Sequence, residues 1–408
     1  MALKKTWRWF GQKDSITLSD IKQIGIEGIV TALHHIPNGE IWPVDEIIKI
    51  KTEIEKHGMQ WSVVESLPVS EGIKTKSHDW HRLISNYQQS LRNLGACGIN
   101  TVCYNFMPVL DWARTSLKYY LPTGGEVMFF NLPVFVAFDA YILKRPDAEK
   151  DYPSDIVEKA KKAYANMSEE EKEELAYNII VLTQGFINGS IGDSVTDFKQ
   201  VFLDLISRYN DIDRDKYRQH LSDFLKEVVP VAEEVGIKLC IHPDDPPFPV
   251  LGLPRIVSTL DDLQWICNQY DSLNNGITFC TGSLSVHPDN NSVNIIQKLG
   301  SKIHFAHLRN NNFKEDGSFY ESGHIEGKVN MYYIIKALIL EQQRRIWEGR
   351  LDTRIPFRPD HGVKILDDFM KDANPGYPLI GRLKGLAEIT GIEFAVEQEL
   401  GICKPPMY

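Results

Sequence analysis

Residues 276–282, Gly-Ile-Thr-Phe-Cys-Thr-Gly, and residues 303–309, Ile-His-Phe-Ala-His-Leu-Arg, are two short runs rich in β-branched and aromatic side chains. Such runs are typical of β-strands, and most of their positions are apolar. A strand without a polar face belongs to a sheet that helices cover, because neither face meets water. The same kind of run occurs eight times in the chain, at residues 6–10, 28–33, 61–66, 101–106, 238–242, 276–282, 303–309 and 355–360.

Segments with a 3.6-residue apolar period lie between most of these runs. Residues 47–54, 221–228 and 331–338 each carry such a stripe, and Gly236 follows the second one as a typical helix-terminating glycine. Eight strands that alternate with helices favour a closed (β/α)8 TIM barrel over a doubly wound sheet. We therefore expect an α/β protein in which residues 1–408 form a single TIM-barrel domain.

One connection is much longer than a usual βα loop. The fourth run ends near Phe106, and the helix expected after it begins only near Lys216, whereas such loops usually take about two to six residues. Ser168 and Glu171 have the spacing of a capping box at the start of an acidic helix. We expect residues 115–215 to form a helical insertion at the C-terminal rim of the barrel, where it serves as a lid, a subunit contact or a solvated decoration.

Composition excludes several classes of partner. The 408 residues are 43% hydrophobic and 25% charged, and 45 basic against 55 acidic residues give a formal charge of −10. No excess of positive charge exists to neutralise phosphates or anionic lipid, so nucleic acid and membrane surfaces are not expected partners. No apolar stretch approaches the ~18 residues that span a bilayer, and no apolar signal segment follows residues 1–10, so a cytoplasmic protein with six reduced cysteines is expected.

Four consecutive predicted strands end in a potential metal ligand: His242, Cys280, His307 and Asp360. The carboxyl ends of barrel strands converge around one pocket, so we expect these side chains to meet. Two imidazoles, a thiolate and a carboxylate suit Fe²⁺, Mn²⁺, Co²⁺ or Zn²⁺ better than Mg²⁺ or Ca²⁺. A lone histidine or cysteine near a strand end is usually a packed residue, so the four equivalent positions together carry this prediction. With four protein ligands, the ion has an open position for a substrate only if it binds five or six groups. This requirement favours Mn²⁺ or Fe²⁺ over tetrahedral Zn²⁺.

Other polar residues lie at or just beyond the predicted strand ends. Arg309 follows His307 by one two-residue step, where it can pair with a carboxylate held by the metal. Arg358 is interpreted either as part of an ion pair inside the barrel or as a substrate contact. Asp111 and Arg114 are further groups at this rim. The residues expected to contact a substrate are Arg309, Glu65, Asn105 and His324.

Some residues near these positions receive a purely structural interpretation. Asp244 and Asp245 are flanked by prolines, as turn-forming carboxylates often are. Cys240 lies two residues before His242 on the same predicted strand and is interpreted as a small core residue. No phosphate-binding loop or dinucleotide fingerprint occurs in the sequence, so nucleotide cofactors are not indicated.

Longer blocks of sequence resemble the mannonate dehydratase family. They are LHHIPNGE (33–40), WSVVESLP (61–68), CYNFMPVLDWART (103–115), HPDDPP (242–247), GLPRIVST (252–259), FCTGS (279–283), FRPDHG (357–362) and NPGYPLIGRLKGLAE (374–388). The resemblance covers nearly the whole chain, including the long insertion typical of one branch of the family.

This resemblance implies a metal-dependent barrel, similar to xylose isomerase, that removes water from D-mannonate to give 2-dehydro-3-deoxy-D-gluconate in hexuronate (glucuronate) breakdown. It implies Mn²⁺ or Fe²⁺ as the cofactor and the same four ligands that the strand ends indicate. The family's proposed proton-transfer groups correspond to His361 and Tyr377, in an order of base and acid that stays open. A small sugar acid is the expected partner, and a homodimer is a generic expectation.

The chain also departs from the family pattern, at Ser70, Gly72, His287, Asn330 and Val363. If these positions touch the substrate or support a metal ligand, the activity is weak, shifted to another sugar acid, or absent. Two alternatives therefore stay open. The first is a metal-dependent sugar isomerase or epimerase on the same barrel, and the second is a catalytically silent barrel that binds a sugar acid.

Overall fold

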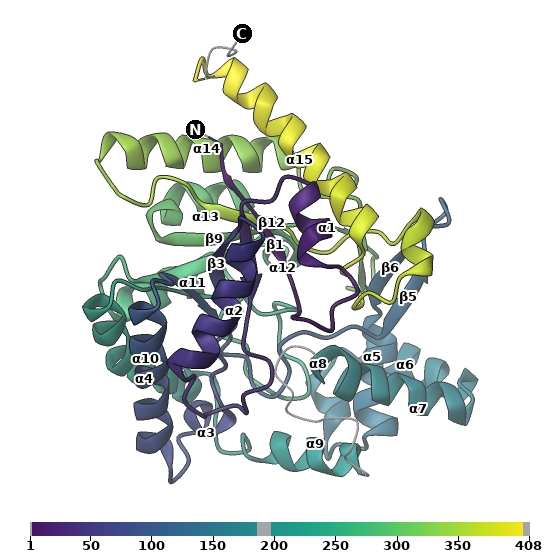
Figure 1. Ribbon diagram of the computed structural model, residues 1–408. Helices are drawn as coiled ribbons and strands as arrows, with labels where there is room; N and C mark the ends of the chain where they lie inside the picture. Colours follow the sequence, from purple (N-terminus) through teal and green to yellow (C-terminus); the bar gives the residue numbers. More distant parts are fainter. Residues whose placement is uncertain (1, 186–196, 403–408) are drawn as a thin grey trace.

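Eight parallel strands close into a barrel in the computed structural model, which describes residues 2–185 and 197–402 (Figure 1). Each strand pairs with the next in chain order, and the last pairs with the first, so the predicted TIM barrel is confirmed. The barrel strands are β1 (Lys4–Arg8), β2 (Gly28–Thr31), β3 (Gln60–Glu65), β4 (Thr101–Tyr104), β7 (Lys238–Ile241), β8 (Asn275–Cys280), β9 (Ile303–Leu308) and β12 (Pro356–Pro359).

Helices surround this barrel and bury an apolar layer against its outer face. The predicted stripes lie on α2, α10 and α14, and Gly236 follows α10 with a φ of 69°, a conformation that glycine adopts at little cost. The helices are α1 (Leu18–Gln23), α2 (Val44–Lys56), α3 (Glu71–Lys74), α4 (Trp80–Ala96), α10 (Arg214–Glu234), α11 (Leu260–Gln269), α12 (Thr281–Val286), α13 (Ser292–Leu299), α14 (Met331–Trp347) and α15 (Leu379–Glu399), with short turns η4 (Gly300–Lys302) and η5 (Leu366–Met370).

A smaller apolar layer fills the barrel itself. Val30, Val63, Cys103, Cys240 and Phe305 are fully buried there and pack on one another. The structural interpretation of Cys240 as a core residue is thus confirmed. Because side chains alternate along a strand, the residues two positions above this layer point into the upper mouth of the barrel.

The segment 115–215 differs from a purely helical insertion because it begins with a β-hairpin, β5 (Ser116–Tyr120) and β6 (Glu126–Phe130). This hairpin joins β10 (Asn310–Phe313) and β11 (Phe319–Ser322), which follow β9, in a four-stranded sheet of order β10-β11-β6-β5. We call it the accessory sheet. The helical part gathers on one side of the barrel (Figure 1) and comprises α5 (Leu132–Ala137), η1 (Phe138–Ile142), η2 (Ala148–Asp151), α6 (Ser154–Asn166), α7 (Glu169–Tyr177), η3 (Asn178–Leu182), α8 (Thr183–Gly185) and α9 (Phe198–Ser207).

Several local predictions meet a direct test. Ser168 and Glu171 form the expected capping box at the start of α7. The helix predicted from Lys216 starts two residues earlier, at Arg214, because Asp213 caps it. Five of the six cysteines are free thiols, and Cys403 lies outside the described residues. Within residues 2–185 and 197–402, every helix is too short or too polar to cross a bilayer.

Candidate active site

Four elements at one end of the barrel carry the predicted metal ligands. Cys280, the last residue of β8, pairs in register with His307 of β9. Asp360 directly follows β12, and its backbone N–H donates to the carbonyl of Leu308 at 3.2 Å. His242 directly follows β7, and its N–H donates to the carbonyl of Tyr104 at 2.9 Å. Strand pairing alone therefore brings the four positions to the same mouth of the barrel.

Three of these side chains form a compact group of donors. The ligand atoms of His242, Cys280 and His307 all lie within 4.8 Å of one another, and His242 Nε2 is 3.1 Å from His307 Nδ1. Two nitrogens bound at ~2.1 Å and at right angles on one ion would lie about 3.0 Å apart. Asp360 lies beside this group and not within it: its Oδ2 is 3.8 Å from His307 Nδ1 and 4.0 Å from the Cys280 sulfur, but only the other three residues have ligand atoms within 4.8 Å of one another.

Neighbouring groups orient both imidazoles toward this cluster. His242 Nδ1 lies 2.7 Å from the carbonyl oxygen of Pro243, so it donates there and leaves the Nε2 lone pair facing the other donors. His307 Nε2 lies 3.5 Å from Glu65 Oε1, which leaves Nδ1 on the cluster side. The donor set and the orientation of both rings fit a borderline divalent cation.

Cys280 lies in surroundings that favour its thiolate. Its sulfur accepts hydrogen bonds from the backbone N–H and the hydroxyl of Ser283, at 3.4 and 3.2 Å. Burial alone would raise the pKa of this thiol, but the charge of Arg309 foremost, together with the contacts of the sulfur with His242 and His307, outweighs it and holds the pKa well below its usual value. A thiolate is the form of cysteine that binds metals.

Arg358 holds the two carboxylates nearest the cluster. It makes a bidentate pair with Glu65 at 2.9 and 3.1 Å and also contacts Asp360. Burial would raise the pKa of both carboxyl groups, but Arg358 foremost keeps each pKa well below its usual value. The interpretation of Arg358 as one side of an ion pair inside the barrel fits this arrangement.

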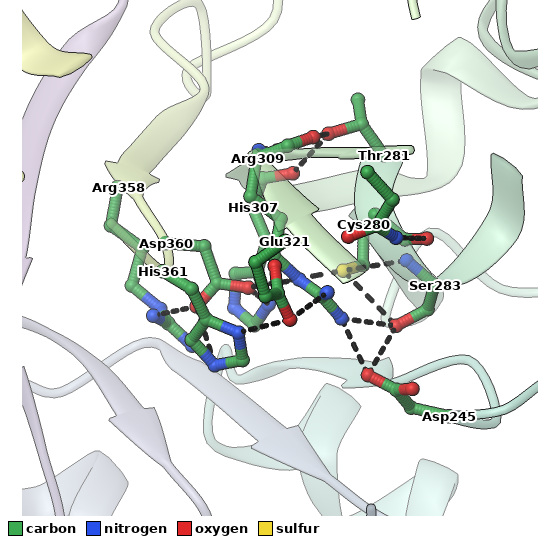
Figure 2. Close-up of polar contacts among 12 residues, drawn as sticks. Asp245, Cys280, Thr281, Ser283, His307, Arg309, Glu321, Arg358, Asp360 and His361 are labelled. Atoms are coloured by element: carbon green, nitrogen blue, oxygen red, sulfur yellow. Dashed lines mark hydrogen bonds and ion pairs between the residues drawn. The ribbon is translucent and has the colours of Figure 1, made fainter. Parts of the chain in front are cut away.

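A closed ring of four charged side chains lies beside the cluster. Arg114 pairs with Asp245 at 2.8 and 3.1 Å and with Glu321 at 2.8 Å. Arg309 contacts the same two carboxylates, Asp245 at 2.5 Å and Glu321 at 2.9 Å (Figure 2). All four side chains are buried. We call this set the arginine–carboxylate ring.

The arginine–carboxylate ring changes two interpretations made from sequence. Asp245 is not a simple turn residue, because its buried carboxylate bridges Arg114 and Arg309. Arg309 does reach a carboxylate of the predicted metal site, with Nε 2.9 Å from Asp360 Oδ2. Each of its three guanidinium nitrogens therefore lies beside a protein carboxylate, and its role as a substrate contact stays a prediction.

A small cavity of about 50 Å³ opens above the cluster, and His361 and Tyr377 both line it. Their rings meet edge to face with centroids 5.1 Å apart. Burial foremost raises the pKa of Tyr377, so its hydroxyl holds its proton. The residues that line the cavity are Arg8, Phe10, Glu65, Ser66, Asn105, Asp111, Trp112, His242, Asp245, Arg309, Arg358, Asp360, His361 and Tyr377.

Asn105, Glu65 and Arg309 thus lie where a substrate contact was expected, but His324 does not line this cavity. His324 is buried, and a Cβ built on Gly385 of α15 would lie 2.1 Å from its ring. Burial lowers its pKa to about 4. The ring packs against a helix, so its predicted role as a substrate contact finds no support in this geometry.

The five departures from the family pattern also lie away from the cavity lining. Ser70 begins α3, and Gly72 within that helix packs against Leu83. Asn330 caps α14, with its side chain accepting from the N–H of Tyr332. The other two are His287, which ends α12, and Val363, which packs against the loop at Gly125.

A closed parallel barrel with two imidazoles, a thiolate and a carboxylate at its upper mouth defines a TIM-barrel enzyme of the metal-dependent class. The family model described as D-mannonate dehydratase (UxuA) matches residues 3–402. The chain therefore belongs to the D-mannonate dehydratase family, whose members are hydro-lyases.

Individual relatives agree with this assignment. The chain is 47% identical over 399 residues to a mannonate dehydratase of Marinomonas sp. (strain MWYL1), covering 98% of this chain and 100% of the relative. It is 50% identical over 394 residues to mannonate dehydratase 1 of Agrobacterium fabrum, covering 96% of each. The crystal structure of mannonate dehydratase from Streptococcus suis serotype 2 superposes with a TM-score of 0.76 at 31% identity, covering 99% of this chain and 96% of that one.

Glu321 is a site residue that sequence reasoning missed. It lies on β11 and contacts Arg114, Arg309 and His361. The signal for its strand is present in the sequence, because Asp316-Gly317 separates two short runs and is a typical hairpin turn. Nothing local to that hairpin indicates that it turns back over the barrel mouth, since pairing with β6 determines its position.

Proposed function

We propose that this protein catalyses the dehydration of D-mannonate to 2-dehydro-3-deoxy-D-gluconate, using Mn²⁺ or Fe²⁺. One observation carries the proposal: His242 and Asp360, two of the four proposed ligands, line the same cavity as the two proton-transfer candidates in a member of the D-mannonate dehydratase family. The departures from the family pattern lie outside the cavity lining, so they give no reason to prefer another substrate or a silent protein.

Four side chains of this chain would hold the metal: His242, Cys280, His307 and Asp360. When bound, the divalent cation supplies positive charge against which negative charge on the substrate carboxylate can build up. The soft thiolate and the imidazoles favour Mn²⁺ or Fe²⁺ over Mg²⁺, and the carboxylate suits the harder ions among them. Arg309 and Arg358 keep Asp360 charged and fixed in position.

His361 and Tyr377 are the proposed proton-transfer pair. The elimination removes a weakly acidic proton from C2 and expels hydroxide from C3, so it needs one proton acceptor and one proton donor. Tyr377 holds its proton in this buried site and is suited to donate it to the departing hydroxide. His361, whose ring contacts that of Tyr377 edge to face in the cavity wall, takes the C2 proton.

A product assay tests the proposal against its alternatives. Protein purified without oxygen and loaded with Mn²⁺ is incubated with D-mannonate, and formation of a 2-keto-3-deoxy acid is measured. Appearance of this acid supports the dehydratase. An isomeric aldonate or ketose as product would establish the isomerase or epimerase, and binding without turnover would establish the silent barrel. The cytoplasmic location and the homodimer expected from sequence stay predictions.

A further inference from the structure

We propose that Glu321 is a positioning residue for His361, holding the ring in the orientation and tautomer that leave Nε2 free to accept a proton. This inference rests on the proposed function and adds a residue to its site. His361 Nδ1 lies 2.9 Å from Glu321 Oε1 (Figure 2). A carboxylate can only accept hydrogen bonds, so Nδ1 must carry the proton in this contact, and neutral His361 keeps its lone pair on Nε2.

The surroundings of Glu321 keep its carboxyl group ionised and its side chain fixed in position. Burial would raise the pKa of its carboxyl group, but the positive charges around it, Arg309 foremost and Arg114 with it, outweigh this effect and lower the pKa to about 2. The same oxygen, Oε1, receives Arg114 Nη2 at 2.8 Å and Arg309 Nη1 at 2.9 Å. Two guanidinium groups therefore fix the position of Oε1, the atom that His361 contacts. If the imidazole of His361 rotated, Oε1 could not move with it and the hydrogen bond would break.

Backbone pairing aims Glu321 at the barrel mouth. Phe319 and Tyr320 of β11 pair with Phe130 and Phe129 of β6. Phe319 and Glu321 share one face of β11 and are both buried, whereas Tyr320 between them is half-buried. The strand thus presents Glu321 to the barrel, and the ring of Phe319, stacked on Phe130 at 5.2 Å, anchors that face.

Aromatic neighbours hold the ring of His361 in one plane. Its centroid lies 5.5 Å from that of Trp112 and 5.1 Å from that of Tyr377. These contacts restrict tilting of the imidazole but do not distinguish its two nitrogens, because an aromatic ring can pack against the edge that carries either one. The hydrogen bond to Glu321 makes that distinction, because Nδ1 lies 2.9 Å from a carboxylate oxygen whereas Nε2 lies 3.8 Å from Asp360 Oδ1, beyond hydrogen-bond distance. The inference consequently ties the proton-accepting atom of the proposed mechanism to one carboxylate outside the barrel.

Glu321→Gln tests the inference, with Glu126→Gln as a matched control. Glu126 is a buried glutamate of the same accessory sheet whose ion-pair partner is Lys364. For Glu321→Gln we expect kcat on D-mannonate to fall about 10- to 100-fold with KM within about twofold, as for other carboxylate–histidine pairs. Bound Mn²⁺ and the melting temperature verify the site and the fold. A KM increase with unchanged kcat would overturn the positioning role.

A second measurement works without turnover and therefore separates this inference from the proposed function. The protein is labelled with ¹⁵N-histidine and loaded with diamagnetic Zn²⁺, and the His361 signals are assigned by their absence from His361→Gln. We expect the Nδ1-protonated tautomer in the parent chain and in Glu126→Leu, and a mixture or the Nε2-protonated form in Glu321→Leu, which removes the acceptor oxygen that a glutamine would keep. The same tautomer in all three proteins would overturn the inference even if D-mannonate is dehydrated.

Discussion

Arg114 and Arg309 bind the same two carboxylates, Asp245 and Glu321, although Arg114 belongs to the loop after β4 and Arg309 directly follows β9. Neither guanidinium is significantly exposed to solvent. The four charged groups have lost their hydration on burial, so each charge is stabilised only by its partners inside the protein. The ring joins the end of the barrel to the accessory sheet.

We expect Arg114→Met to destabilise the protein by about 3–5 kcal/mol, because it leaves Asp245 and Glu321 with one guanidinium between them. Urea unfolding at neutral pH measures the change. Arg92→Met is the control, since Arg92 pairs with Glu234 near the surface at 3.1 Å and such pairs contribute about 0–1 kcal/mol. Equal effects of the two substitutions would show that the ring adds no stability.

Cys280→Ser is expected to weaken Mn²⁺ binding by at least ~10- to 100-fold, because it replaces the soft thiolate with a hydroxyl that stays protonated. Titration of the metal-free protein with Mn²⁺ against a competing chelator gives the affinity. Cys97→Ser serves as the control, since Cys97 ends α4 and does not belong to the donor cluster. Unchanged affinity in Cys280→Ser would remove Cys280 from the ligand set.

Glu65→Gln is expected to lower metal affinity about 10- to 100-fold although Glu65 is no proposed ligand. Glu65 faces His307 Nε2 at 3.5 Å and holds Arg358, so its loss frees the ring of His307 and releases a guanidinium beside Asp360. Titration of the metal-free protein with Mn²⁺ against a competing chelator measures this affinity. Glu27→Gln, at the other end of the barrel and paired with Arg354, should bind metal like the parent; a matching decrease there would contradict the explanation.

His324→Gln is expected to flatten the dependence of stability on pH. Buried His324 has its pKa lowered from 6.5 to about 4, so the unfolded chain takes up a proton first as the pH falls. The contribution of neutral His324 is therefore complete above pH 6.5 and is lost between that value and pH 4, roughly 3 kcal/mol in total.

Urea unfolding at pH 7.5, 6 and 5 tests this linkage, and the difference between parent and His324→Gln should shrink at each step. His81 is exposed, and His81→Gln is the control. Its free energy of unfolding should change with pH in parallel with that of the parent chain. Parallel curves for His324→Gln would show that His324 protonates equally in the folded chain.

The barrel, and the grouping of four candidate ligands at its mouth, could be predicted from the sequence for one physical reason. Strands buried on both faces leave apolar runs, and parallel strands in a closed barrel end at the same mouth. His242, Cys280, His307 and Asp360 could thus be grouped from their places at strand ends, without any knowledge of contacts. Strand limits shifted by a few residues, as for β1, which ends at Arg8 instead of Phe10.

The accessory sheet and the arginine–carboxylate ring could not be predicted in the same way. Both join residues far apart in the chain, such as Arg114 and Glu321, and no periodic pattern records such a pairing. Asp245 illustrates the limit: its prolines indicated a turn, whereas its carboxylate belongs to a buried network that only the folded chain assembles. Burial of His324 behind α15 likewise follows from packing against Gly385.

The pairing of β11 with β6 determines which parts of this protein can be exchanged. Engineers commonly treat long excursions from a barrel as detachable modules to be trimmed or swapped. Here, excising the segment after β4 would remove β6 and leave one edge of β11 without a strand partner. It would thereby also remove what positions Glu321 next to His361. A minimal version of this scaffold must therefore retain the hairpin at residues 116–130, even if the helices between it and α10 are discarded.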